Sequence, residues 1–536
     1  MPSLNEKLAA SLQVLRDRSQ GDRRVFGTDE FGRTDRERLI QHGFLREVMK
    51  GWVMLTRPDE RPGESTSWYA SFWEFCRAYL DDRFKAGWIL GAETSLALLA
   101  GNLNVPRQVV VQSPSASNTA VSLPHGTSIF AYRAPLPSVD PHEAHGMRIY
   151  PAPEALCAAT PNAWVAHRSD IIAVLGSIRS AGPLLRPLLD GGHVAAAGRI
   201  AGAYRLLGRP AVADEIVRTM KQAGHLVREE ANPFKGPVPM QLGSGRPVPP
   251  VMTRIRLMWA EMRDDVIAAF PSEPRLINDR DGYLSSVDEN YVADAYHSLS
   301  IEGYHVTEEL IERVRRGDYD PDRVDGDRQQ KDAMAAKGYW LAFQEVRGAV
   351  ARVLDGEDAA RLAADEHQNW YRALFQPSVA AGLLKPENLA GYRSHLVFLR
   401  DSGHVPVAWT SVPDAMDAFF ECLEGEDDPR VRALLGHYVF TFIHPFPDGN
   451  GRCGRFLLNL MLASGGYPWT IIPVDRREDY LSALEAASGR GDIKPFAGLV
   501  ADCVALEPPP PRRLRRDEAQ APRADAEPVP PGPQAR

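Results

Sequence analysis

The C-terminal half of the chain carries an almost unbroken helical pattern, and no other feature limits its fold as strongly. From Val251 to about Leu506, apolar residues recur at intervals of three and four, the spacing that gathers them on one face of an α-helix. The stretches 252–270, 305–317 and 331–354 show this pattern most clearly. Such faces are buried by packing helices together, so residues 251–505 are predicted to form a mostly α domain.

One segment of this half departs from the helical pattern. Between Ser394 and Trp409, the strings VFL and VPVAW flank an Asp-Ser-Gly-His turn. Short apolar runs on either side of such a turn predict a β-hairpin, standing alone in a helical domain.

The rest of the chain divides into three further regions. Residues 1–62 contain helical patterns followed by an alternating stretch at 44–56, an order that predicts a winged helix-turn-helix. Residues 63–240 form a mixed α/β region, with short strands expected near 107–114 and 127–135. The Gly- and Pro-rich stretch 235–250 separates this region from the helical domain. Residues 506–536, rich in Pro, Ala and charge, are predicted to be a disordered tail.

Charge and cysteine content restrict the class of protein. The net charge is −8, and residues 1–62 hold 12 Lys and Arg against 10 Asp and Glu, so DNA binding through this segment stays open but is weakly supported. The five cysteines are scattered and form no Cys-x-x-Cys pair, so no zinc site is expected and reduced thiols in a cytoplasm are predicted. No stretch reaches the roughly 18 apolar residues of a membrane span, so no membrane contact is expected.

The chemistry concentrates in a short loop, IHPFPDGNGRCGRF, from Ile443 to Phe456. Helical patterns precede and follow it, so the loop joins two buried helices, with Gly449-Asn450-Gly451 just before the second. The first N–H groups of a helix have no partner inside the helix, and glycines let the backbone approach a ligand. The loop therefore predicts a phosphate-binding cradle.

Four side chains add to this cradle. Arg452 and Arg455 lie three apart on the second helix and share a face, and guanidinium groups suit phosphate oxygens. Asp448 offers a hard oxygen ligand of the kind that Mg²⁺ takes together with substrate phosphates. His444 is the side chain in the loop able to act as a base near neutral pH.

The loop resembles the signature of the Fic family, His-x-Phe-x-Asp/Glu-Gly-Asn-Gly-Arg-x-x-Arg, with no departure at any specified position: His444, Phe446, Asp448, Gly449, Asn450, Gly451, Arg452 and Arg455. The resemblance extends over about residues 280–500. It implies a helical Fido domain and the transfer of AMP from ATP to a Ser, Thr or Tyr hydroxyl of a protein, with Mg²⁺.

The resemblance also implies a role for each matched residue. His444 resembles the general base, and Asp448 resembles the Mg²⁺ ligand. Residues 449–451 resemble the anion hole around the α- and β-phosphates, with Arg452 on the β- and Arg455 on the γ-phosphate. Phe446 is expected to point into the core. Residues 394–409 resemble the flap that docks the target as an added strand.

Two segments outside this core carry weaker resemblances. The strings GWVML and HVAAAGRIAGAYRLLGR, at 51–55 and 193–209, are similar to the winged-helix antitoxin component of abortive-infection systems. Upstream of the core, Ser298-x-x-x-Glu302-Gly303 resembles the family's inhibitory pattern, on a helix expected near 291–303. The implied mechanism is competition, in which Glu302 pairs with Arg455 and displaces the γ-phosphate.

The sequence thus predicts a cytoplasmic protein adenylyltransferase held inactive by Glu302. Its expected partners are ATP, Mg²⁺ and a hydroxyl-bearing protein, with self-modification possible. One alternative keeps the site and changes the reaction to removal of AMP or to transfer from another nucleotide. Another is a DNA-binding regulator, acting through residues 1–62, whose Fic domain is silenced.

Overall fold

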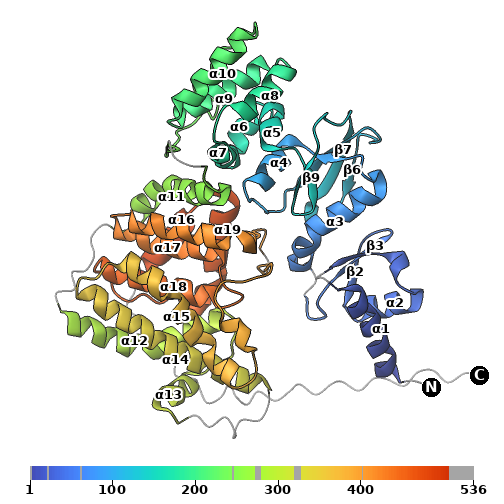
Figure 1. The fold of residues 1–536 in the computed structure, drawn as a ribbon. Coiled ribbons are helices and arrows are strands. Elements are labelled where there is room, and N and C mark those ends of the chain that lie inside the picture. Colours follow the sequence, from blue (N-terminus) through green and yellow to red (C-terminus); the bar gives the residue numbers. More distant parts are fainter. Residues whose placement is uncertain are drawn as a thin grey trace, which may run out of the picture.

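The computed structural model describes residues 3–20, 23–60, 63–243, 247–271, 279–318, 327–400 and 402–505. The predicted tail at 506–536 lies outside them. In Figure 1 the N-terminal units stand at the right, helices α5 to α10 at the top, and the helical body at the left.

The first unit consists of helices α1 (Leu4–Arg18) and α2 (Arg33–Gln41) with strands β1 (Val25–Gly27), β2 (Leu45–Met49) and β3 (Trp52–Leu55). The strands form an antiparallel sheet in the order β1-β3-β2. The expected hairpin is therefore present. The described residues of this unit also include a single turn of 3₁₀ helix at Thr28–Glu30.

The second unit is a mixed sheet covered by one long helix, α3 (Thr66–Phe84). Its strands are β4 (Ile89–Leu90), β5 (Gln108–Ser113), β6 (Thr119–Ser122) and β7 (Ser128–Arg133), in the order β4-β5-β7-β6. The pair β5–β7 is parallel and the other pairs are antiparallel. The strands expected near 107–114 and 127–135 are thus confirmed as β5 and β7. Helix α4 (Ala92–Leu99) and the hairpin β8 (His142–Ala144)–β9 (Met147–Ile149) complete the unit.

Six helices follow: α5 (Ala152–Ala158), α6 (Ala163–Ala166), α7 (Arg168–Ser177), α8 (Gly182–Asp190), α9 (Val194–Leu206) and α10 (Pro210–Gln222). They enclose an apolar core that Ile89 and Leu96 of the second unit and Leu257 of the next helix also enter. Within the described ranges, no single helix is long and apolar enough to cross a membrane; the bent pair α7 and α8 meets that test by length and composition alone.

The helical body confirms the mostly α prediction. It contains α11 (Pro250–Ala269), α12 (Arg280–Ile301), α13 (Glu308–Arg316), α14 (Asp327–Leu354), α15 (Ala359–Ala380), α16 (Val412–Glu424), α17 (Pro429–Ile443), α18 (Asn450–Ser464), α19 (Arg477–Arg490) and α20 (Lys494–Ala505). One apolar core extends through it from Val251 to Cys503. Helices α17 and α18 pack against each other and are buried on almost every side, which fixes the turn between them.

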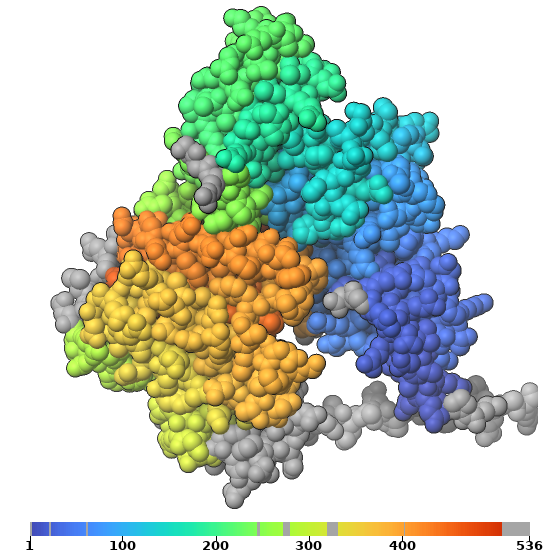
Figure 2. All heavy atoms as spheres, in the orientation of Figure 1, coloured from blue at the N-terminus to red at the C-terminus, as the bar shows by residue number. Residues whose placement is uncertain are grey.

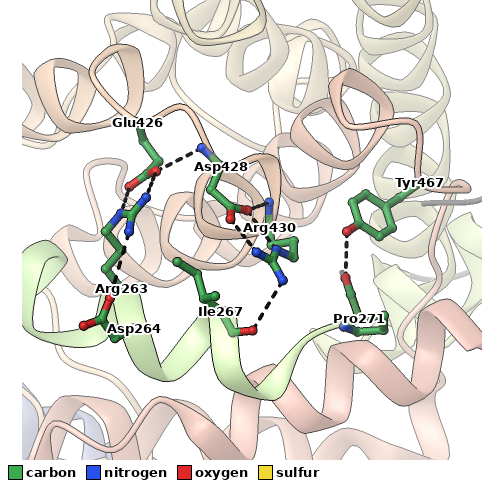
Figure 3. A network of polar contacts seen from close by, with 8 residues as sticks. All are labelled: Arg263, Asp264, Ile267, Pro271, Glu426, Asp428, Arg430 and Tyr467. Carbon is green, nitrogen blue, oxygen red and sulfur yellow. Dashed lines mark hydrogen bonds and ion pairs between the residues drawn. The ribbon is translucent and has the colours of Figure 1, made fainter. Parts of the chain in front are cut away.

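Polar contacts hold α11 against the start of α17 (Figure 3). Arg263 of α11 donates to Glu426, and Arg430 of α17 donates to the main-chain oxygen of Ile267 at 3.4 Å. The Tyr467 hydroxyl, just after α18, donates to the oxygen of Pro271 at 2.8 Å. Helix α11, which begins where the Gly- and Pro-rich stretch ends, is therefore part of the helical body.

The predicted β-hairpin at 394–409 is wrong. The structure assigns no strand to residues 394–400 or 402–409, which we call the strap. Its polar backbone groups bond to side chains in place of a strand ladder: the Arg393 guanidinium donates to the oxygens of His395 and Val407, and the N–H of Val405 donates to Oδ1 of Asn104. A short apolar run predicts a strand only where a neighbouring strand is available.

The strap lies between the helical body and the N-terminal half. Val405 is buried in the core that contains Val25 to Ile149, and Phe398 packs against the same core. The space-filling view in Figure 2 shows the N-terminal units in blue beside the orange part of the body.

Candidate active site

The turn between α17 and α18 has a backbone that few sequences tolerate. Helix α17 ends at Ile443, and His444 follows with φ 55° and ψ 61°, in the left-handed region. Gly449 precedes α18 with φ 78°. A non-glycine residue with positive φ is uncommon and persists where its surroundings hold it. The predicted loop between two buried helices is confirmed.

Phe446 and Asn450 hold this turn together. The Phe446 ring is fully buried and stacks on Tyr371 at 4.1 Å between centroids. The Asn450 side chain accepts the N–H of Phe446 at 2.9 Å and donates to the oxygen of the same residue at 2.8 Å. Both the oxygen and the nitrogen of the Asn450 side-chain amide are therefore engaged within the turn, where they hold its shape.

His444 has the properties of a neutral base. Its Nδ1 lies 3.3 Å from the main-chain oxygen of Thr441, so Nδ1–H donates there and Nε2 keeps its lone pair. Burial of the ring lowers the pKa of His444 to about 4. The imidazole is consequently uncharged at neutral pH and able to accept a proton.

The predicted phosphate cradle lies at the start of α18. Asn450, Gly451 and Arg452 are the first three residues of the helix, so their N–H groups have no partner within it. A Cβ on Gly451 would lie 2.2 Å from Oε1 of Glu302, so this glycine leaves room for a carboxylate oxygen directly over the helix start. A phosphate oxygen is the other kind of acceptor that fits such a place.

Two arginines of α18 have buried donors here that make no hydrogen bond within the described ranges. Arg452 is 1% exposed and Arg455 is 4% exposed. Their buried Nε and Nη2 (Arg452) and Nη1 (Arg455) have no hydrogen-bond partner among the described residues. Buried guanidinium donors without a partner are costly, and a polyphosphate would satisfy them.

The structure brings together Ser298, Glu302 and Arg455, as the inhibitory pattern predicts. Helix α12 ends at Ile301, and Glu302 is its capping residue, followed by Gly303 with φ 84°. Arg455 Nη2 donates to Oε1 of Glu302 at 2.7 Å, and Arg455 Nε donates to Oγ of Ser298 at 2.8 Å. The helix begins at Arg280, well before the expected 291.

Asp448 is the candidate metal ligand. Its side chain is 64% exposed, with Oδ2 at 3.5 Å from Nη2 of Arg452 and Oδ1 accepting the N–H of Gly449. The described residues contain no cluster of three or more His, Cys, Asp or Glu that could hold a metal by themselves. One exposed carboxylate beside a phosphate cradle fits Mg²⁺ that takes its other ligands from substrate phosphates and water.

Sequence reasoning missed three residues of the site. The Arg452 guanidinium lies between the rings of Tyr304 and Phe375, 5.2 and 5.0 Å from their centroids. Tyr304 follows Gly303 directly, so its place next to the inhibitory pattern was a usable signal. Phe375, on α15, and Arg393, in the irregular segment after Leu389, carried no such signal because their places in the site depend on tertiary packing. Arg393 donates to the oxygen of His444 at 2.8 Å.

Comparison with known proteins gives the same assignment. The model of the Fic/DOC family matches residues 361–462. A protein adenylyltransferase Fic from Nematostella vectensis is 41% identical over 127 residues, which cover 23% of this chain and 29% of that protein. The relative from Drosophila grimshawi is 42% identical over 106 residues, covering 19% and 22%. The chain thus spans less than a third of the length of these relatives.

Among solved structures, residues 134–508 of Fic-1 from C. elegans are 18% identical, with a TM-score of 0.34, covering 66% of this chain and 95% of that one. A Fic-domain signaling protein from Bacteroides thetaiotaomicron is also 18% identical, with a TM-score of 0.34, covering 46% and 92%. On the sequence matches and the complete motif, this chain carries a domain of the Fic/DOC family.

Proposed function

We propose that this protein transfers AMP from ATP to a hydroxyl group of a protein. The observation that supports it most is the α17–α18 turn, in which a neutral His444 stands beside a helix start and two arginines with unpaired buried donors. The turn lies within residues 361–462, which the Fic/DOC family model matches, and relatives named protein adenylyltransferase match 127 and 106 residues of the chain.

In the proposed reaction His444 Nε2 accepts the proton of the target hydroxyl. The hydroxyl oxygen bonds to the α-phosphorus while the bond to the bridging oxygen of pyrophosphate breaks, and pyrophosphate leaves with the electron pair. The first N–H groups of α18, Arg452 and Arg455 stabilise the charge on the phosphates. Asp448 would hold Mg²⁺, whose positive charge would stabilise the negative charge on the departing pyrophosphate.

In the same proposal Glu302 restrains the reaction. Its carboxylate is bonded to Arg455 and lies over Gly451, so it competes for the donors that ATP needs. It also repels the polyphosphate. ATP bound against this carboxylate would be displaced from in-line geometry, and a misplacement of about 1 Å can cost on the order of 100-fold in rate.

Label transfer from α-labelled ATP tests the proposal. The Glu302→Gly protein is expected to incorporate label on the order of 100-fold faster than the unmodified chain. Glu302→Gln is the matched variant, because it keeps the side chain's length and removes its charge. Adding His444→Ala to Glu302→Gly should abolish transfer while ATP binding persists. Transfer that survives at the parent rate would remove His444 from the reaction.

DNA binding through residues 1–62 stays a prediction. Its test is a gel shift with the intact chain at several salt concentrations, because phosphate contacts weaken steeply with salt. Removal of AMP by the same site is tested by incubating the Glu302-containing protein with its own AMP-modified form.

A further inference from the structure

The Arg393 side chain lies buried beneath the α17–α18 turn. It is 3% exposed. Its Nε donates to the main-chain oxygen of His444 at 2.8 Å, and its Nη2 lies 3.4 Å from the oxygen of Ile443. On its other side Nη1 donates to the oxygen of His395 at 3.1 Å, and Nη2 donates to that of Val407. One guanidinium therefore joins the end of α17 to both ends of the strap.

Arg393 has no ion-pair partner among the described residues. Burial lowers its pKa to about 10, so it stays protonated at neutral pH. Its charge is balanced by carbonyl oxygens, and two of these belong to the last turn of α17, where the helix dipole is negative. A buried charge without a carboxylate partner is costly unless hydrogen bonds compensate it, and four carbonyl oxygens do so here.

These contacts hold the turn between α17 and α18, which carries His444. His444 sits in the left-handed region, which is unfavourable for a residue with a Cβ. Arg393 donates to two successive main-chain oxygens of this turn. Its Nε donates to the oxygen of His444, and its main-chain N–H donates to the oxygen of Pro445 at 2.9 Å. The direction of the His444 ring is set by this backbone.

We propose that Arg393 is a positioning residue, which orients His444 and fixes the strap at a set distance from it. The inference rests on the proposed AMP transfer. Within the described part of the chain, Arg393 makes no hydrogen bond or ion pair with the α18 cradle, so it acts on proton removal and leaves ATP binding alone. Lysine cannot replace it, because an ammonium group is a single point and cannot reach four carbonyls arranged around a planar fork.

The test compares Arg393→Lys with its parent in the Glu302→Gly background, using self-labelling from α-labelled ATP and the binding of ATP. We expect the labelling rate to fall by about 10- to 100-fold, with ATP affinity unchanged. The acid limb of the pH–rate profile should move up, because a loosened turn admits water to the His444 ring. Free guanidinium ions should restore part of the activity of Arg393→Ala.

Arg430→Lys is the matched control. It removes another guanidinium that donates to a main-chain oxygen of the same body, far along α17 from His444, and it should leave the pH profile in place. If Arg393→Lys does not fold, as judged by its melting curve, Arg393→Gln replaces it.

The outcomes separate the two proposals. A parent protein that takes up no label contradicts the AMP-transfer proposal itself. A parent that labels, with a folded Arg393 variant labelling at the same rate and with the same pH profile, contradicts the positioning role alone. A loss of ATP affinity equal to the loss of rate would also contradict it.

Discussion

At the scale of single residues, the environment of His444 determines how it can act. Histidine has an ordinary pKa near 6.5, and burial lowers that of His444 to about 4. The deprotonated ring is the form that accepts a proton. Activity is therefore expected to be retained as pH falls through 6.5 and lost only as it approaches about 4.

The measurement is kcat/KM for label transfer by the Glu302→Gly protein as a function of pH. An acid limb centred near 6.5 would show that the His444 ring is solvated in the working enzyme. The acid stability of the protein is followed in parallel by circular dichroism, so that unfolding is not taken for titration.

Tyr304 and Phe375 hold the Arg452 guanidinium between two rings, which leaves it fixed in direction. Loss of one such cation–π contact costs roughly 0.5–2 kcal/mol. In the Glu302→Gly background, Tyr304→Ala should weaken ATP binding about 2- to 30-fold, as calorimetry can measure. Tyr304→Phe keeps the ring and should bind ATP as the parent does. Equal weakening by both substitutions would assign the effect to the hydroxyl.

At the scale of the element, the C-terminal end of α12 faces α18 and carries the proposed restraint. Ser298 and Glu302 lie four apart on one face, and both bond to Arg455. Asp294, one turn earlier, is buried and accepts the Tyr339 hydroxyl at 2.7 Å, and burial raises its pKa to about 6. This face of α12 thus carries a polar residue on each of three successive turns. The apolar periodicity of the sequence does not predict such a polar face.

Ser298→Ala separates the two bonds of this restraint. The change leaves Nε of Arg455 buried without its partner, a loss of about 1–3 kcal/mol in the free energy of unfolding. The Glu302–Arg455 ion pair remains, so self-labelling should rise much less than in Glu302→Gly. Urea unfolding and label uptake measure the two effects. If the self-labelling rate of Ser298→Ala rose as much as that of Glu302→Gly, Ser298 would account for most of the restraint.

At the scale of the whole molecule, the N-terminal half reaches the active-site region through the strap. Asn104, in the loop after α4, accepts the N–H of Val405 at 3.0 Å, and Arg400 pairs with Glu64 at 3.2 Å. The N–H groups of Gly403 and His404 are taken by Glu485 and Ser402. In this conformation residues 403–405 have no N–H left for the added strand that the family resemblance implies.

Asn104→Ala should therefore loosen the strap without unfolding either half. The expected result is faster hydrogen exchange at Val405, by up to about tenfold for a lost bond of roughly 1 kcal/mol, with α17 and α18 unchanged. Asn232→Ala removes a similar amide from a loop of the N-terminal half distant in sequence from the strap contact and should not affect Val405. Unchanged exchange in Asn104→Ala would mean that the strap is held by its packing alone.

The sequence by itself determined the helical body, the turn between two buried helices and the pairing of Glu302 with Arg455. The helical body and the turn follow from local periodicity and from a motif whose letters are close together in the chain. The pairing follows from the resemblance to the family's inhibitory pattern, although its two residues are 153 apart in the sequence. Only the tertiary structure decided the state of the strap, the role of the Asn450 side chain and the sites of Tyr304, Phe375 and Arg393. Each depends on partners supplied by distant segments: Asn104 is 301 residues from Val405, and Arg393 is 51 residues from His444. Hydrogen-bond partners across such separations leave no periodic trace in the sequence.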